Sequence, residues 1–360
     1  MSDILDHCTT FKLDQVEAEL QAGYESTVQF DKPIGESLLM VDPEESDFNK
    51  WPIEPSVPYL KRLDAMCAKW GERLTVRFYA HYGQIFDGSQ LQNLPNIHSL
   101  SADSLDQANN LEAIAELKHL SRLHLGVFEQ EDKALLSKLP IGQLRELTLS
   151  ATNTKALDLA PLGAATQLRK LYLDGHYKNI AVLGGLTGLE EFIFNAKTGL
   201  DLAFINGMTE LKSLKFNLGG TKTIEEIELL HVQDMAFTET RGLCELGDMQ
   251  RFPSLRRLLM QDQQHISQIK LGAANTALEH LWFYKCKKIN ALPGIEYCSS
   301  LKSLRWLFTE INPASLALPD TLTHLHMLSG KRKSEAQEIA AIEELGYIVD
   351  DHPDASFFYK

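Results

Sequence analysis

The feature that most constrains the fold is an apolar pattern that recurs about every 23 residues through residues 97–330. Each unit has the form L-x-x-L-x-L, where L is mostly a large apolar residue. Successive units start 21 to 24 residues apart, at Ile97, Leu120, Leu144, Leu168, Leu189, Leu211, Val232, Leu255, Leu278, Leu301 and Leu322. A fixed period of this size, held over eleven units, is the signature of stacked structural repeats.

Each unit predicts one short strand and one compact return segment. In the return segments the apolar residues fall at every third position, as in Ile180, Leu183 and Leu186. That spacing suits 3-10 turns or short helices with one side facing a core. A single unit cannot bury its apolar side, so neighbouring units must stack and their strands must form a parallel sheet.

The L-x-x-L-x-L register and the repeat length resemble leucine-rich-repeat proteins, and the internalin-like class most. The resemblance covers residues 97–330. It implies an α/β solenoid with one curved parallel sheet on a concave face and 3-10 turns or short helices on the convex side. It also implies that the concave face binds another protein.

One feature departs from the family pattern, which places Asn or Cys at the ninth position of each repeat. The chain has Cys286 at one such position and Asn at none. We therefore expect a less regular solenoid than the family norm. The segment Gly219–Thr223, with its Gly-Gly pair, is where the irregularity should be greatest.

Three further segments flank the repeats. Residues 1–56 are rich in proline and acids and predict an irregular extension. Residues 57–96 combine a helical apolar face with an alternating strand at 74–79, which predicts an N-terminal cap or a degenerate first repeat. Residues 331–360 predict a C-terminal cap of a helix, beginning at Ser334 and ending at Gly346, followed by a strand.

The overall charge of −14 argues against a nucleic-acid partner, because phosphate binding needs a basic surface. Residues 1–95 hold 16 acids and eight bases, so the acidity lies mainly in the N-terminal part. The chain has no leader-like start and no run of 18 uncharged apolar residues, which predicts no membrane association. Five scattered cysteines favour a reducing compartment, and we expect a cytoplasmic protein.

The sequence predicts no catalytic, metal or cofactor site. Gly219-Gly-Thr-Lys-Thr223 has the wrong order for a phosphate loop. His280 is two strands from His324 and His326, about 10 Å away, which is too far to share an ion. Cys286 and Cys298 fall at core positions of the repeat.

A partner site is predicted near the C-terminal end of the concave face. Residues between the apolar positions of each strand point away from the core. Toward the end of the array they become aromatic and apolar, as binding hot spots are. The alternative is that a C-terminal loop or the cap covers them. The candidate partner-binding residues are Tyr172, Leu259, Trp282, Tyr284, Arg305, Leu307, Phe308, His326 and Leu328.

We expect a protein-binding module, such as an inhibitor or immunity-type protein that sequesters a partner, and an acidic chain of this kind suits a basic enzyme. One alternative is an exported effector that binds a host protein, because Leu318-Pro-Asp-Thr-Leu-Thr-His-Leu325 resembles repeats of secreted bacterial effectors. A second alternative is an enzyme whose site lies in the N-terminal segment.

Overall fold

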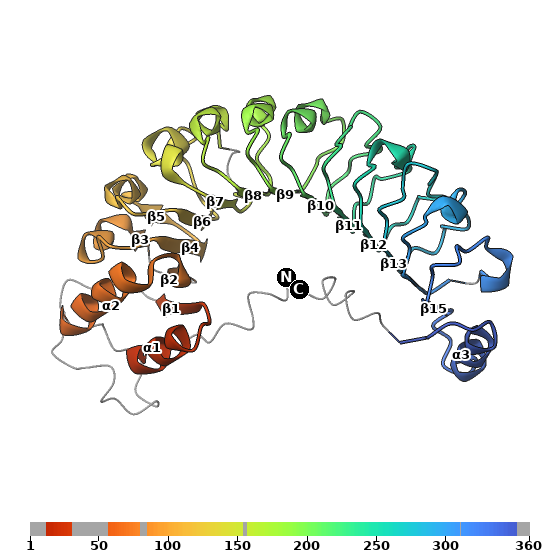
Figure 1. The fold of residues 1–360 in the computed structure, drawn as a ribbon. Coiled ribbons are helices and arrows are strands. Elements are labelled where there is room, and N and C mark those ends of the chain that lie inside the picture. Colours follow the sequence, from red (N-terminus) through yellow and green to blue (C-terminus); the bar gives the residue numbers. More distant parts are fainter. Residues whose placement is uncertain (1–11, 31–56, 80–84, 154–156, 310, 351–360) are drawn as a thin grey trace. The chain divides into compact units, whose positions relative to one another are not determined.

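A computed structural model describes residues 12–30, 57–79, 85–153, 157–309 and 311–350. The chain divides into two compact units, residues 1–186 and residues 187–360. Both units are built from the same repeat of a strand and a return segment. Within each unit the strands lie on one side and the 3-10 turns lie on the other (Figure 1).

The first unit contains six parallel strands in the order β1-β2-β4-β6-β7-β8. Their bounds are Ser26–Phe30 (β1), Leu74–Tyr79 (β2), Ser99–Leu105 (β4), Arg122–Val127 (β6), Glu146–Leu149 (β7) and Lys170–Leu173 (β8). Two very short strands, Phe86–Asp87 (β3) and Ala108–Asn109 (β5), pair with each other beside this sheet. The return segments are 3-10 turns: Gly88–Asn93, Leu111–Glu116, Leu135–Lys138, Ile141–Gln143, Ala160–Ala164 and Ile180–Gly185.

The prediction of an irregular extension over residues 1–56 is wrong for residues 12–30. These form helix α1 (Leu13–Gln21) and strand β1, which pairs in parallel with β2. The helix buries Leu13, Val16 and Leu20, and the strand alternates buried and half-buried residues. Phe30 of β1 stacks on Phe78 of β2 with the ring centroids 5.1 Å apart. The array of strands therefore begins well before residue 97.

For residues 57–96, the structure favours the degenerate first repeat over a separate cap. Helix α2 (Val57–Trp70) and a 3-10 turn (Gly71–Arg73) lead into β2. Strand β2 pairs with β4 in the register of the later repeats, with Val76 opposite Leu100. A helix replaces the usual return segment because Leu60, Leu63 and Cys67 share one helical face.

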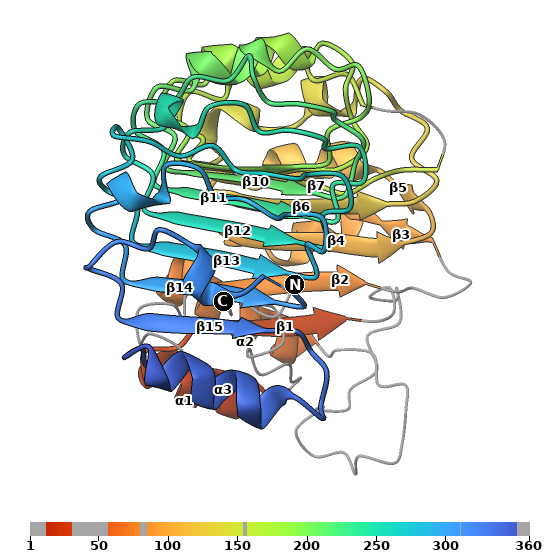
Figure 2. The ribbon, with the colours of Figure 1, turned by 90° about the vertical axis from the view of Figure 1, so that its right-hand side faces the viewer.

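The second unit contains seven parallel strands in sequence order from β9 to β15. Figure 2 shows β11 to β15 running side by side, with helix α3 beyond β15. The strands are Glu191–Phe194 (β9), Ser213–Asn217 (β10), Asp234–Thr238 (β11), Arg257–Gln261 (β12), His280–Tyr284 (β13), Ser303–Leu307 (β14) and His324–Leu328 (β15). The 3-10 turns of this unit are Ala203–Gly207, Met249–Arg251, Ile295–Tyr297 and Pro313–Ser315.

The repeat pattern places the core as predicted. All three apolar positions of all eleven units are buried. Each strand from β4 onward, except the two-residue β5, begins two residues after the first apolar position, so the predicted strand positions are confirmed. In the second unit, Phe194, Phe216 and Phe237 form a ladder through the core, with ring centroids 4.9 and 5.1 Å apart.

The ninth position of several repeats bonds to the backbone without asparagine. The buried His176 accepts from the Leu157 N–H through Nδ1 at 3.0 Å, and its Nε2 lies 2.9 Å from the Ser150 carbonyl oxygen. The Gln263 amide donates to the Phe237 carbonyl at 3.0 Å. The Cys286 Sγ lies 3.3 Å from the Met260 carbonyl oxygen. Three different side chains thus link neighbouring repeats as asparagine would.

The segment with the Gly-Gly pair is irregular, but it is not the one irregular segment in the described residues. Among these residues, no 3-10 turn forms between β10 and β11 or between β12 and β13. Gly219 has φ +88°, and a Cβ there would lie 2.5 Å from the Ala196 carbonyl oxygen. Only glycine fits this close approach to the preceding repeat.

The C-terminal cap contains the predicted helix, α3 (Glu335–Glu344), which packs against β15. Gly346 follows the helix with φ +90°, as expected of a helix stop. The Ser334 hydroxyl donates to the Glu338 carboxylate at 2.7 Å instead of capping the helix backbone. Ile348 forms a parallel bridge with His324, so the last described residues continue the sheet. Within the described ranges, no helix is long and apolar enough to cross a membrane.

Candidate functional site

The strand face of the second unit brings most of the predicted partner-binding residues together. Leu259, Trp282, Arg305 and His326 lie side by side in one register across β12 to β15. A second row, two residues further along each strand, contains Tyr284, Leu307 and Leu328. Adjacent strands are about 4.8 Å apart, so these side chains form one continuous surface.

Trp282 points out of the sheet but is largely covered. Only 9% of its surface is exposed. The Arg305 guanidinium lies over its ring, 4.9 Å from the centroid. An outward position therefore does not make this indole accessible, because the next strand supplies a side chain long enough to cover it. Arg305, Tyr284 and Leu307 remain partly exposed.

An aromatic pair, Tyr284 and Phe308, forms the edge of this surface where β13 and β14 end. The rings of Tyr284 and Phe308 meet edge to face at 5.3 Å. The Lys285 Nζ lies over the Tyr284 ring at 5.0 Å. Phe308 has φ +65°, and its ring lies against Gly330, where a Cβ would approach it to 2.5 Å. Sequence reasoning missed Lys285, whose place beside the aromatic residues follows from its position directly after β13.

The C-terminal cap covers only part of the predicted surface. Helix α3 packs on β15, and Leu328 is 9% exposed. Leu259, Leu307, Phe308 and His326 are half-buried. The surface over β12 to β14 therefore keeps solvent contact in the described part of the chain.

Two histidines of this face, His280 and His324, form hydrogen bonds with neighbouring side chains. His280 is 1% exposed, and its Nδ1 lies 2.9 Å from the Ser303 hydroxyl. The His324 Nδ1 lies 2.8 Å from the Thr323 hydroxyl. Over the described ranges, no group of three His, Cys, Asp or Glu residues is arranged to hold a metal ion.

Cys286 and Cys298 are fully buried, which confirms that they are core residues. Burial raises the pKa of the Cys286 thiol to about 11 and that of Cys298 to about 12. Both thiols are therefore protonated at neutral pH and are poor nucleophiles.

The strand face of the first unit carries a network of polar side chains over β2 to β7. Arg77 of β2 donates to both carboxylate oxygens of Asp103, at 2.7 and 2.5 Å. The Ser101 hydroxyl donates to Asp103 at 2.6 Å and lies 3.1 Å from the His124 Nδ1. The His124 Nε2 in turn lies 3.1 Å from the Ser150 hydroxyl. A chain of hydrogen bonds thus crosses from β2 to the end of β7.

The proton positions in this chain follow from the donors available. The Ser101 proton points at Asp103, so the His124 Nδ1 must donate to Ser101 and its Nε2 must accept from Ser150. Burial lowers the pKa of His124, although Asp103 opposes the shift. The arrangement resembles a nucleophile with its base, but the Ser150 N–H is bonded to the Leu125 carbonyl and cannot stabilise an oxyanion. We interpret this series of hydrogen bonds as structural.

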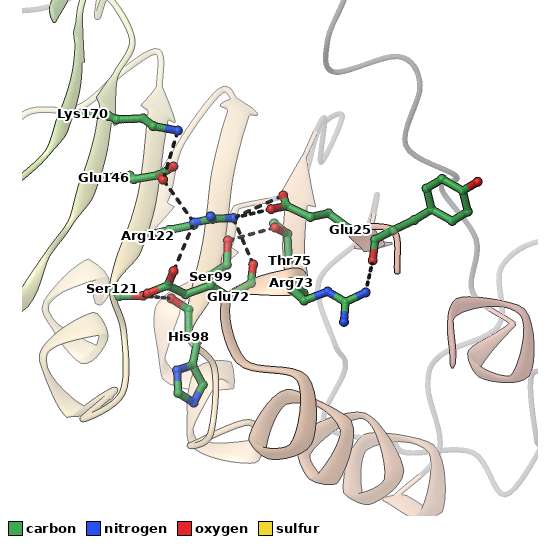
Figure 3. A network of polar contacts seen from close by, with 11 residues as sticks. Glu25, Glu72, Arg73, Thr75, His98, Ser99, Ser121, Arg122, Glu146 and Lys170 are labelled. Atoms are coloured by element: carbon green, nitrogen blue, oxygen red, sulfur yellow. Dashed lines mark hydrogen bonds and ion pairs between the residues drawn. The ribbon is translucent and has the colours of Figure 1, made fainter. Parts of the chain in front are cut away.

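A second polar network anchors the N-terminal part to the repeats. Figure 3 shows Glu25, Glu72 and Glu146 around the Arg122 guanidinium. The distances from guanidinium nitrogens to their carboxylate oxygens are 3.2, 3.7 and 3.4 Å. Arg122 also donates to the Glu72 carbonyl at 3.1 Å, and Lys170 pairs with Glu146. The sequence gives no signal for this network, because Glu25 is 97 residues from Arg122.

Tyr172, the remaining predicted contact residue, lies on β8 of the first unit. It is opposite Thr148 and is half-buried. Burial raises its pKa, with a smaller contribution from Asp174. Its partner on β7 is polar, and it lies in the other unit from the aromatic surface over β12 to β15.

Comparison with known proteins gives matches to solved structures alone. No family model and no curated protein matches the sequence. The similar solved structures include internalins and a leucine-rich-repeat protein. An internalin from Listeria monocytogenes is 20% identical over 67% of this chain and 74% of its own, with a TM-score of 0.45. A leucine-rich-repeat protein of Leptospira interrogans is 14% identical over 96% and 100%, with a TM-score of 0.49. The mouse RP105/MD-1 complex shows 16% identity over 90% and 59%, with a TM-score of 0.49.

Proposed function

We propose that the chain is a protein-binding leucine-rich-repeat module whose partner contacts the strand face over β12 to β15. The observation that carries this proposal is the continuous surface of Leu259, Arg305, Tyr284, Leu307 and Phe308, which remains partly exposed. Aromatic residues and arginine on a rigid surface are the groups that dominate protein interfaces. Strands fix these side chains more firmly than loops would.

The proposed mode of action is sequestration of the partner, as by an inhibitor or immunity-type protein. The same residues fit an effector that binds a host protein, and the identity of the partner distinguishes the two. The four cysteines in the described ranges are free thiols, which supports a reducing compartment such as the cytoplasm.

The experiment is capture of the partner from a lysate of the source cells on immobilised protein. We compare the wild type with Arg305→Ala and Tyr284→Ala, and use Thr148→Ala on the first unit as the control. The two variants should retain less than a tenth of the captured protein, at an unchanged melting temperature, whereas the control should retain all of it.

The proposal is contradicted if the captured protein is the same and equally abundant on all four columns. Trp282→Ala is a poor substitute in this experiment. Its ring is nearly buried, so truncation would destabilise the fold itself.

A further inference from the structure

Helix α3 packs one side on β15 and leaves the other side exposed. Ile342 lies on the packed side and is 1% exposed. Ala336, Ala340 and Glu344 follow one another at intervals of four residues on the opposite side, and all three are exposed. Figure 2 shows this helix beyond β15, after the last strand of the second unit. Its outward side is therefore a row of small side chains that ends in a carboxylate.

Charged residues stand at both ends of α3. Arg332 and Lys333 come shortly before the helix, and Glu343 and Glu344 are its last two residues. All four side chains are exposed, and none has a hydrogen bond or an ion pair with another residue in the described part of the chain. A helix has a partial positive charge at its N-terminus and a partial negative charge at its C-terminus, so both pairs oppose the helix dipole. The acids of the first turn offset the basic pair, but the last turn has no base.

The two charged pairs cannot neutralise each other within one chain. A helix of ten residues is about 15 Å long, which exceeds the distance of about 8–10 Å over which charges act in physiological salt. A second copy with its helix antiparallel removes this separation, because the basic pair of each copy then meets the acidic pair of the other. One helix thus carries both halves of a contact, as a two-fold interface requires.

We propose that two copies of the chain associate through antiparallel packing of their α3 helices. The small side chains of Ala336 and Ala340 let the helix axes approach to about 8 Å, at the short end of the usual range. Parallel packing would place like charges together, and a different protein would have to supply both charges at the same spacing. The contact lies on a helix and not on the strand face, so the inference is independent of the proposed function.

The dimer should be weak and reversible. A contact between two ten-residue helices is smaller than the interfaces that hold stable dimers. Exposed ion pairs contribute little one at a time, but here a basic pair meets an acidic pair at both ends of the contact. Reversal of either pair turns attraction into repulsion at both ends, so charge reversal is the sharpest test.

The test measures dimerisation of the full-length protein by analytical ultracentrifugation in 0.15 M salt over a wide range of protein concentration. One variant reverses the acidic pair, Glu343→Lys with Glu344→Lys. A second variant reverses the basic pair, Arg332→Glu with Lys333→Glu. The two variants are also mixed in equal amounts, with a fluorescent label on one of them to detect a heterodimer.

The control, Glu116→Lys with Glu131→Lys, changes the net charge of the chain as much as the acidic-pair variant does. Both positions are exposed and lie in the first unit. Circular dichroism at low protein concentration checks that every variant is folded. Both α3 variants should melt no lower than the wild type, because their new charges agree with the helix dipole.

The wild type should dimerise as its concentration rises, and each α3 variant alone should have a dissociation constant at least tenfold higher. The control should differ from the wild type by less than twofold. The mixture of the two α3 variants should form a heterodimer with an affinity within threefold of the wild type, because each reversed pair then meets the opposite charge on the other chain.

A wild type that stays monomeric at every concentration would overturn the inference. A dimer that neither α3 variant weakens would do the same, because it would use another surface. Failure of the two folded variants to pair in the mixture would show that α3 does not pack against α3 of a second copy.

Discussion

At the scale of single residues, the backbone near the end of several strands adopts a conformation that the residue types do not predict. Residues at the eighth position of the repeat have positive φ in six cases without glycine: Ser104, Leu218, Glu239, Asp262, Lys285 and Phe308. A left-handed conformation costs a non-glycine residue about 1–2 kcal/mol. The stacking of the repeats imposes this conformation, and the sequence does not signal it.

Glu239 offers a test of this cost. Its φ is +50°, and its N–H donates to the Gln261 carbonyl at 3.0 Å, a bond that glycine keeps. We predict that Glu239→Gly raises the free energy of unfolding by about 0.5–1 kcal/mol, because relief of strain exceeds the entropy that glycine adds to the unfolded chain. Glu239→Val should lower it by about 1 kcal/mol or more. Urea denaturation measures both, and an equal loss in both variants would contradict the account.

His176 makes stability depend on pH. Burial lowers its pKa from 6.5, although the Ser150 carbonyl opposes the shift, and a proton on Nδ1 would break the bond from Leu157. The unfolded chain therefore binds more protons below pH 6.5, and stability falls as the pH drops from 6.5 through the folded pKa. We predict that His176→Gln, whose amide can bond in the same way, flattens the fall in urea midpoint between pH 7 and 5. An unchanged fall in the urea midpoint would be inconsistent with this role. Part of the pH dependence should remain in the variant, because His98 and His124 also contribute to it.

At the scale of elements, Arg122 connects the first described strand to the repeats. Its side chain is 23% exposed and pairs with Glu25, Glu72 and Glu146. We predict that Arg122→Met costs about 1–2 kcal/mol and increases hydrogen exchange in β1, because carboxylates lose a partly buried partner. Lys118→Met is the control, since Lys118 and its partner Glu116 are both highly exposed. Equal exchange in β1 for the two variants would show that the network does not hold this strand.

Strand β1 also illustrates what the sequence could not reveal. From β4 onward the strands were predictable because three apolar residues repeat in a fixed register. Ser26–Phe30 lies 48 residues before the matching position in β2, so no period identifies it. In the candidate site, the register of Trp282, Arg305 and Leu307 was predictable from alternation along the strands. The cover that Arg305 places on Trp282 was not, because it depends on a side-chain conformation between two strands.

At the scale of the whole molecule, each repeat is stabilised by its neighbours. Removal of a terminal repeat should therefore destabilise the repeats next to it. Removing residues 1–56 deletes α1 and β1 and exposes the β2 edge together with Phe78. We predict that the truncated chain self-associates and melts at a lower temperature, because an uncovered strand edge pairs with other chains. A truncated protein that is monomeric by light scattering and melts like the full chain would contradict this prediction.

The central claim is that the second unit binds a partner protein through the strand face over β12 to β15. The most direct measurement places a photo-cross-linking amino acid at Leu307, and in a second protein at Thr148 of the first unit, and identifies the adducts formed in the source cells. Both positions point outward from a strand and are half-buried. The account predicts one dominant protein adduct at position 307, lost on adding Arg305→Ala, and none of it at 148. A protein that cross-links only at 148, or no adduct at 307, would contradict it.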